Sequence, residues 1–358
     1  MYFHVFTSEN VYSFALLSLF EKNIDLRNHF FFFGFGKKQK TTIHYSTELS
    51  QQIKYLQKPA DIVFFLKNIK AAKWIYLHYL AYDPTLLFWA TNLLLLKKTT
   101  WVVWGNDIYS YYKRNKNLKT RIYERLRVKV IANIPEIAAF VREDFDLIKS
   151  IYKTNANYSD ILYPLPVNIE HLNFEKTISK SHDLKFLIGN SGDPSNLHHE
   201  MITYLSRFKD EKITVFCPLS YGGSKEYREA IVQHGKDAFG DNFVAITSHL
   251  EKEAYAQFLN SIDIALMNHK RQQGLGNILP LLYLDKKVFL RTDITSYYFF
   301  QRQKCEVFNI ETLNVISFKE LVSLTEIESN NKQIVTEIMS EKNYLNLWMN
   351  LINRHKND

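Results

Sequence analysis

Cysteine, glycine and proline are scarce in this chain. Its 358 residues include 2 Cys, 11 Gly and 8 Pro. Cys217 and Cys305 lie in apolar or loop contexts, which favours a reducing compartment over a disulfide framework. No Cys/His cluster has the spacing of a zinc site, and the shortage of Gly and Pro argues against long disordered linkers. We therefore expect a cytoplasmic protein with no metal site and no resident cofactor.

Long hydrophobic runs and negative charge are also in short supply. The longest apolar stretch, Thr85–Leu96, is too short to span a bilayer and predicts a buried helix, with an interfacial helix as the alternative. Residues 1–6 alternate like a strand and lack a basic leader segment, so we expect no signal peptide. The 45 Lys and Arg exceed the 37 Asp and Glu, giving a net charge of +8. This excess indicates an acidic partner: a nucleotide, a nucleic acid or an anionic membrane.

Strand-like and helix-like segments alternate along the chain, which predicts mostly parallel sheets covered on both faces. The rhythm breaks near Pro164 and Pro166 and restarts at Leu184, so we expect two α/β domains. Five local assignments are tested below. The pattern predicts helices over 50–58 and 135–152, one helix through 85–96, and strands over 128–133 and 161–163. A strand at 41–45 and a polar linker at 168–181 are also expected.

The loop Gly189–Asn196 follows an apolar run and precedes a helix-like segment that starts near Leu197. A strand, a small-residue loop and a helix start present backbone N–H groups to an anion. Several of its residues are also good helix N-caps, so an ordinary capped turn is the alternative. The candidate phosphate-binding residues are Gly189, Asn190, Ser191, Gly192, Asp193, Ser195 and Asn196.

A second glycine loop, Arg271–Asn277, follows the predicted strand 263–267. An arginine at its start suits a forked contact with a diphosphate, and its glycines free the backbone at the next helix start. Neither loop matches a P-loop or the dinucleotide fingerprint. Together they predict a phosphate site that adds Arg271, Gln272, Gln273, Gly274, Gly276 and Asn277.

Residues 109–130 are basic and aromatic, with Glu124 as their single acid. A helix of this kind could lie on an anionic membrane or follow a nucleic-acid backbone. A solvated basic helix is the third alternative. The membrane-facing candidates are Lys113, Arg114, Lys116, Lys119, Arg121 and Arg125.

His78 and Asp107 each come directly after a predicted strand of the first half. Asp107 could act as a general base on an acceptor hydroxyl, or it could cap the next turn beside Asn106. His78 could be a base or a hydrogen-bond donor, or it could simply pack in the core. No Ser-His-Asp arrangement is evident in the sequence.

Three motifs in the same order resemble glycosyltransferase family 56. They are Trp104-Gly105-Asn106-Asp107-Ile108-Tyr109, the loop Gly189–Asn196, and Arg271-Gln272-Gln273-Gly274-Leu275-Gly276. The resemblance covers nearly the whole chain and includes the turn Tyr221–Tyr227, which adds Tyr221 to the donor-site candidates. The segment Asn28–Lys40 is richer in Phe and Lys than the family leads one to expect, which sets the acceptor side apart.

The resemblance implies a GT-B fold: two Rossmann-like domains facing a cleft. The acceptor would bind domain 1–166 and the nucleotide sugar domain 167–335, while helix 336–358 crosses back to the first domain. It implies metal-independent transfer of 4-acetamido-4,6-dideoxygalactose from dTDP to a polyprenyl-diphosphate-linked saccharide, in bacterial surface polysaccharide synthesis. The enzyme would be cytoplasmic and peripherally held at the inner membrane, with no nucleic-acid partner. The alternatives are another nucleotide sugar and acceptor, or a basic nucleic-acid-binding protein.

Overall fold

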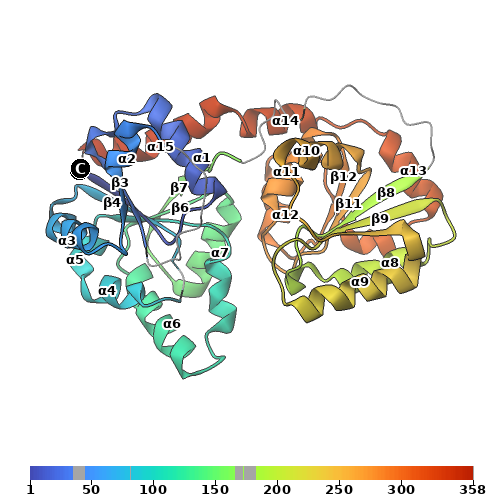
Figure 1. Ribbon diagram of the computed structural model, residues 1–358, viewed down its shortest axis with the longest axis horizontal. Coiled ribbons are helices and arrows are strands. Elements are labelled where there is room, and N and C mark those ends of the chain that lie inside the picture. Colours follow the sequence, from blue (N-terminus) through green and yellow to red (C-terminus); the bar gives the residue numbers. More distant parts are fainter. Residues whose placement is uncertain (35–44, 81, 166–171, 173–182, 358) are drawn as a thin grey trace. The chain divides into compact units, whose positions relative to one another are not determined.

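A computed structural model describes residues 1–34, 45–80, 82–165, 172 and 183–357. The chain forms two compact units (Figure 1): Met1–Leu165 with Ser340–Asp358, and Pro166–Met339. Most of the strand expected at 41–45 and nearly all of the linker expected at 168–181 lie outside the described residues.

The first unit is built on a seven-stranded parallel sheet of order β3-β2-β1-β4-β5-β6-β7. The strands are β1 (Tyr2–Phe6), β2 (His29–Phe33), β3 (Ile53–Tyr55), β4 (Trp74–His78), β5 (Thr99–Val102), β6 (Glu136–Ala139) and β7 (Asn157–Asp160). The helices are α1 (Val11–Asn23), α2 (Thr47–Gln52), α3 (Pro59–Asn68), α4 (Thr85–Thr91), α5 (Leu93–Leu96), α6 (Leu118–Ile131), α7 (Arg142–Tyr152) and α15 (Glu341–Asn357). A 3₁₀ turn covers Ile108–Lys113.

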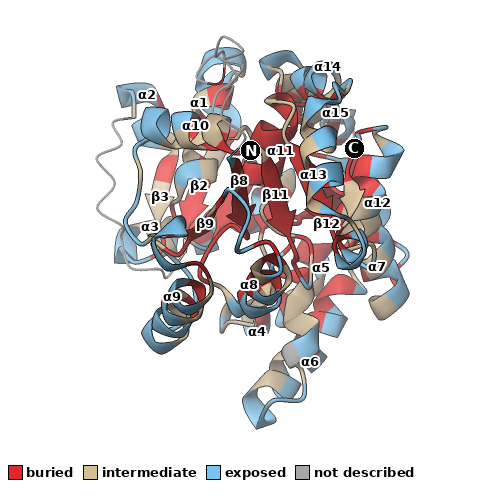
Figure 2. Ribbon diagram, turned by 90° about the vertical axis from the view of Figure 1, so that its right-hand side faces the viewer, coloured by how far each residue is buried: buried red, intermediate tan, exposed pale blue. Residues whose placement is uncertain are grey.

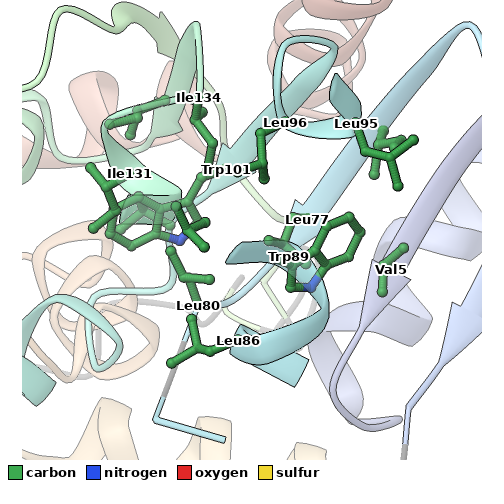
Figure 3. Packing of buried hydrophobic residues seen from close by; sticks show 14 of the residues in the cluster. Val5, Leu77, Leu80, Leu86, Trp89, Leu95, Leu96, Trp101, Ile131 and Ile134 are labelled. Carbon is green, nitrogen blue, oxygen red and sulfur yellow. The ribbon is translucent and has the colours of Figure 1, made fainter. Parts of the chain in front are cut away.

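This sheet is buried on both faces, which is why its strands read as nearly continuous apolar runs. Phe3, Phe32, Ile75, Trp101 and Ile137 have no exposed surface and belong to one cluster. Figure 3 shows part of the same cluster, in which side chains from the strands meet side chains from the helices. The sheet is therefore a rigid platform for the loops at its edges.

The second unit has six parallel strands in the order β10-β9-β8-β11-β12-β13. They are β8 (Leu184–Ile188), β9 (Ile213–Pro218), β10 (Phe243–Ile246), β11 (Ile264–Met267), β12 (Lys287–Leu290) and β13 (Phe308–Asn309). The helices are α8 (His198–Ser206), α9 (Lys225–Phe239), α10 (Lys252–Ser261), α11 (Leu275–Tyr283), α12 (Thr295–Arg302), α13 (Phe318–Glu326) and α14 (Asn331–Ile338). Figure 2 shows the central strands buried and the outer helix faces exposed.

The last helix, α15, belongs to the first unit although the second unit precedes it in the chain, as the fold prediction expects. Trp348 on this helix is fully buried and donates its indole N–H to the carbonyl of Leu162 at 3.1 Å. Near the end of the helix, His355 Nε2 lies 2.9 Å from a carboxylate oxygen of Glu136. Its ring stacks on Trp74 with centroids 3.8 Å apart. Packing and polar contacts thus fix both halves of α15.

Three predicted helices were wrong in part, two of them because edge pairing and burial outweigh a helical pattern. Residues 53–55 form the short strand β3, in which Ile53 pairs with Phe31 of β2. Within 135–152, residues Glu136–Ala139 form a buried strand and the helix begins only at Arg142. The apolar stretch 85–96 is also two helices, which are interrupted at Asn92.

Two predicted strands were also wrong. Residues 128–131 continue helix α6, because Val130 and Ile131 are its buried face while Val128 and Lys129 are exposed. The edge strand β7 ends at Asp160, ahead of the expected 161–163. In both cases a short apolar run was assigned to the wrong element, an ambiguity that periodicity alone cannot resolve.

Candidate active site

The two glycine loops predicted to bind phosphate lie at one position of the second sheet. After β8 the chain adds β9 and β10 on one side, and it then places β11 on the other side of β8. Gly189–Asn196 follows β8 and Arg271–Asn277 follows β11, so both loops leave the carboxyl ends of adjacent strands. Ligands of open α/β sheets bind at this point, where the strand order reverses.

Asn196 organises the first loop from inside. It is fully buried, and its side-chain oxygen accepts the backbone N–H of Asn190 at 3.0 Å. Its amide nitrogen donates to the carbonyls of Ser191 at 3.1 Å and Asp193 at 2.9 Å. Gly189 has φ 65°, and a Cβ there would lie 2.7 Å from the Asn196 oxygen. This position therefore requires glycine.

Side-chain hydrogen bonds join the two loops. Ser195 Oγ lies 2.8 Å from Gln273 Oε1, and Gln273 Nε2 donates to Asn190 Oδ1 at 3.3 Å. Asn190 Nδ2 in turn donates to the hydroxyl of Tyr221 at 3.3 Å. The backbone carbonyl of Tyr221 also accepts the N–H of Gly192 at 2.7 Å. The loops and the Tyr221 turn are thus one connected structure.

Helix α11 begins at this structure without a side-chain cap. Its N-cap is Gly274, in the left-handed region with φ 72°, and a Cβ there would lie 2.8 Å from His269 Cε1. On the first turn, the buried Asn277 Nδ2 has no hydrogen-bond partner among the described residues. An uncapped helix start beside an unpartnered buried donor has the kind of groups that an anion can contact.

Arg271 supplies the positive charge beside this helix start. Its Nη2 lies 3.9 Å from Asp193 Oδ2, and its side chain is 19% exposed. The other carboxylate oxygen of Asp193 accepts the N–H of Ser195 at 2.9 Å and the Ser195 hydroxyl at 2.5 Å. The first loop therefore holds Asp193 in place, and Asp193 in turn orients the guanidinium of Arg271.

Two buried histidines next to these loops were not predicted as site residues. His269 is fully buried, and burial, followed by the charge of Arg271, lowers its pKa to about 3. Burial likewise lowers the pKa of His198 to about 4. Both rings are therefore neutral at pH 7. Only their positions in the sequence could have indicated these histidines: His269 comes just after β11, and His198 lies at the start of α8.

In the first unit, Asp107 lies at the centre of a hydrogen-bond network. Its Oδ1 accepts the N–H of Trp104 at 3.1 Å, and its Oδ2 accepts the N–H of Leu80 at 3.1 Å and the indole N–H of Trp101 at 2.8 Å. Asp107 is fully buried. Burial raises its pKa, whereas Arg127 and the three hydrogen bonds act in the opposite direction. These bonds join the turns that follow β4 and β5.

His78 belongs to a buried chain of rings across the same sheet. His29 Nδ1 lies 3.1 Å from His4 Nε2, and His4 Nδ1 lies 3.3 Å from His78 Nε2. His78 Nδ1 hydrogen-bonds the hydroxyl of Tyr163, which also accepts the indole N–H of Trp104 at 3.0 Å. Burial lowers the pKa of His78 well below its usual value. Both ring nitrogens of His78 are thus occupied within the core.

Two further residues stand at the reversal point of the first sheet, between β1 and β4. Glu9 comes after β1, is 7% exposed, and accepts the hydroxyls of Tyr55 at 2.7 Å and Tyr45 at 3.3 Å. Tyr79 comes directly after β4 and has φ 83°, which is rare for an aromatic residue. Neither residue belongs to a motif in the sequence, although each lies just beyond a predicted strand.

The basic segment forms one turn of 3₁₀ helix followed by α6. Lys116, Lys119, Arg121 and Arg125 are exposed, and Arg114 is half-buried against Tyr111; the side chain of Lys113 lies outside the described part of the chain. Apolar side chains share the exposed surface: Leu118 is 70% exposed and Ile122 48%. The inner face carries Glu124 and the fully buried Arg127, which contacts the rings of Tyr82, Trp101 and Tyr152.

Within the described ranges, no helix is both long and apolar enough to cross a membrane. The same residues contain no group of three or more His, Cys, Asp or Glu side chains arranged to hold a metal ion.

A family model described as 4-alpha-L-fucosyltransferase, glycosyl transferase group 56, matches residues 28–356. The chain belongs to this family. The group 56 protein is therefore a glycosyltransferase, an enzyme class that takes a sugar from a nucleotide-sugar donor to an acceptor.

Solved structures similar to this group 56 protein share its fold at low sequence identity. Sucrose-phosphate synthase from Thermosynechococcus elongatus has a TM-score of 0.69 at 10% identity, and all of both chains are covered. Anabaena HepE, solved with UDP and glucose, has a TM-score of 0.67 at 11% identity, covering 99% of this chain and 100% of that one. A UDP-forming α,α-trehalose-phosphate synthase from Burkholderia xenovorans has a TM-score of 0.59 at 10% identity, covering 99% and 98%. The fold is GT-B, as predicted.

Proposed function

We propose that the two joined loops of the second unit bind the diphosphate of the nucleotide sugar. The observation that carries this proposal is the uncapped start of α11. There the backbone N–H groups, the unpartnered buried Asn277 Nδ2 and the guanidinium of Arg271 gather beside Gly189–Asn196. These donors would stabilise the negative charge that develops on the leaving diphosphate, a role that a metal ion fills in other enzymes.

The proposed donor-binding residues are those of the two loops with Tyr221. Asn196 shapes the first loop, while Asn190, Ser195 and Gln273 fix the distance between the loops. Tyr221 is 57% exposed and offers a flat ring beside the loops. By family resemblance, the donor is dTDP-4-acetamido-4,6-dideoxygalactose and the acceptor a polyprenyl-diphosphate-linked saccharide of surface polysaccharide synthesis.

For Asp107 and His78 the geometry supports positioning roles in the first unit. Among the described residues, the Asp107 carboxylate accepts hydrogen bonds from the turns after β4 and β5 and from the core residue Trp101. His78 is 1% exposed and bonded on both ring nitrogens. We propose that both hold the carboxyl edge of the first sheet, where the acceptor saccharide binds.

We further propose that α6 docks on the cytoplasmic face of the inner membrane. Glu124 is the only acid of this helix and it is buried, so the exposed surface carries basic and apolar side chains together. Anionic lipid attracts such a surface by about 1 kcal/mol per Lys or Arg near the headgroups. This position would keep the enzyme close to a lipid-linked acceptor.

The donor site is tested by calorimetric titration with dTDP-4-acetamido-4,6-dideoxygalactose, beside UDP and GDP sugars. Arg271→Ala should weaken donor binding roughly 10- to 100-fold, because hydrogen bonds to charged groups contribute about 1.5–3 kcal/mol. Arg142→Ala, an exposed arginine of the first unit, is the matched control and should bind as the wild type does. Turnover should persist in EDTA. Unchanged affinity in Arg271→Ala would exclude the phosphate role, and preference for another nucleotide would replace the proposed donor.

Membrane docking is tested by co-sedimentation with phosphatidylglycerol and phosphatidylcholine vesicles at increasing salt. The triple variant Lys119→Ala/Arg121→Ala/Arg125→Ala should lose salt-sensitive binding to the anionic vesicles. Removing three exposed lysines elsewhere, Lys149, Lys209 and Lys252, should have little effect. Equal binding by both triple variants would contradict docking through α6. Salt-sensitive binding to DNA that exceeds vesicle binding would favour the nucleic-acid alternative.

A further inference from the structure

The strand order of the first sheet also reverses at one point, and a carboxylate lies in a segment beside that point. The strand order reverses between β1 and β4, so the segments after these two strands flank the place where an open α/β sheet binds its ligand. Glu9 is in the first of these segments and Tyr79 in the second. This is the topological position that the glycine loops occupy in the second sheet.

The carboxylate of Glu9 is held on one side only. Oε1 accepts the hydroxyls of Tyr55 and Tyr45, whereas Oε2 has no hydrogen-bond partner among the described residues. Burial and the hydrogen bond to Glu9 raise the pKa of Tyr55, so its phenol remains a donor at neutral pH. Two phenols thus fix the direction of the carboxylate and leave one oxygen for another group.

The other two acid–base candidates of this unit differ in this respect. Asp107 receives hydrogen bonds on both carboxylate oxygens and is fully buried. His78 is bonded through both ring nitrogens. A general base must reach the proton that it removes, directly or through one water molecule. Of these three residues, Glu9 is the one with an unoccupied proton-accepting atom.

Backbone strain marks the same place. Tyr79 is held at φ 83°, and the next N–H, that of Leu80, is fixed by Asp107 at 3.1 Å. Asn106 Nδ2 lies 3.5 Å from the Tyr79 hydroxyl. A non-glycine residue in this conformation costs about 1–3 kcal/mol and persists mainly where function requires the geometry. The strained turn places the Tyr79 phenol beside Asn106, in the turn that follows β5.

We propose that Glu9 is the catalytic base, which rests on the proposed glycosyl transfer. The acceptor oxygen forms its bond to the anomeric carbon of the donor as the bond from that carbon to the diphosphate oxygen breaks. The electron pair leaves with the diphosphate. The acceptor's proton passes to Glu9 Oε2, and the resulting carboxylic acid later releases it to water. Attack from the side opposite the leaving group inverts the anomeric configuration. Tyr45 and Tyr55 are positioning residues.

The test compares Glu9→Gln with the wild type, using the donor and acceptor that support turnover. Glutamine keeps an oxygen for the two phenols and removes the base, so kcat should fall roughly 10²- to 10⁴-fold, the usual contribution of a general base. The donor KM and the calorimetric affinity for the donor should stay unchanged. Glu48→Gln, at an exposed position on α2, is the matched control and should retain wild-type kcat.

Two further measurements separate catalysis from structure. In Glu9→Ala, added formate or azide should restore part of the turnover, because a small anion can occupy the vacated position; a purely structural carboxylate would show no such rescue. NMR of the product should show inversion. Full turnover of Glu9→Gln, or a product with retained configuration, would overturn the proposal. Either result can occur while the wild type still binds the donor, so the proposed function would stand. If the wild type does not bind the donor, the proposed function itself is contradicted and this inference is overturned with it.

Discussion

Asn196 and Asn190 are joined by a hydrogen bond of 3.0 Å between a side-chain oxygen and a backbone N–H. This bond spans the glycine loop from its last residue to its second and sets the direction of the N–H groups between them. The amide of Asn196 also binds two carbonyls of the same loop. One buried side chain therefore determines the shape of the proposed phosphate-binding loop.

Replacing this side chain should open the loop. Asn196→Ala leaves the Asn190 N–H and the Ser191 carbonyl unpartnered, and each buried group of this kind costs about 1–3 kcal/mol. We expect a lower melting temperature and donor binding at least tenfold weaker. Asn314→Ala, on an exposed position of the same unit, is the control. Normal donor affinity in Asn196→Ala would show that the loop shape is not needed for binding.

The N-cap position of α11, residue 274, should accept only glycine. In Gly274→Ala the new Cβ meets His269 Cε1 at 2.8 Å while φ stays at 72°. Gly240→Ala is a close control, because Gly240 has φ 57° but nothing within 4 Å of an added Cβ. Gly240 lies at φ 57° and ψ −127°, a sparsely populated conformation, so we expect about 1–3 kcal/mol of destabilisation in the control from backbone strain alone. Gly274→Ala should in addition lose donor affinity in calorimetric titration.

Asp107→Asn distinguishes a positioning residue from a proton acceptor. The carboxylate receives three hydrogen bonds, and an amide in its place can accept fewer while adding an N–H₂ donor in the core. We expect unfolding to become easier by about 1–3 kcal/mol, with donor affinity unchanged. Asp146→Asn, on the exposed face of α7, should leave stability unaltered. A wild-type melting temperature combined with abolished transfer would instead identify Asp107 as the base.

The buried histidine chain should make the first unit sensitive to acid. Burial lowers the pKa of His4 and His78 well below the value of 6.5, and burial together with Lys356 and the N-terminal ammonium lowers that of His29 to about 4. Below pH 6.5 the unfolded chain therefore binds protons that the folded chain does not. The free energy of unfolding should fall as pH decreases from 6.5 toward 4, by up to about 1.4 kcal/mol per pH unit for each histidine.

Urea titrations at several pH values measure this slope. His78→Gln should flatten it, whereas replacement of His249, which lies in an exposed loop, should not. Equal slopes for both variants would show that His78 does not contribute to the acid sensitivity.

Much of the proposed donor site could be read from the sequence because its signals are local. Strand, glycine loop and helix start occur in immediate succession at Leu184–Leu197 and again at Ile264–Tyr283. The family motifs then placed both loops in one domain. What could not be read was the connection between them, since the Ser195–Gln273 bond joins residues 78 positions apart.

Contacts between distant segments also explain which features of the first unit could not be predicted from the sequence. Glu9 stands out only once Tyr55 folds onto it from 46 positions away. The sequence predicts that Asp107 is a base or a helix cap. Only its contacts with Leu80 and Trp101 indicate a third role, which is to hold the turns after β4 and β5. The helix and strand errors at 50–58 and 128–133 arose where burial by another element, not local pattern, decides the conformation.

The return of α15 to the first unit has a consequence for biosynthesis. Trp348 packs against the rings of Phe20 and His78, and these side chains lie in segments made some three hundred residues earlier. During translation this part of the first unit must wait, uncovered, until the whole of the second unit and the last helix have left the ribosome. Until α15 has been made, the nascent chain therefore exposes an aromatic surface, and exposed hydrophobic surface of this kind promotes aggregation.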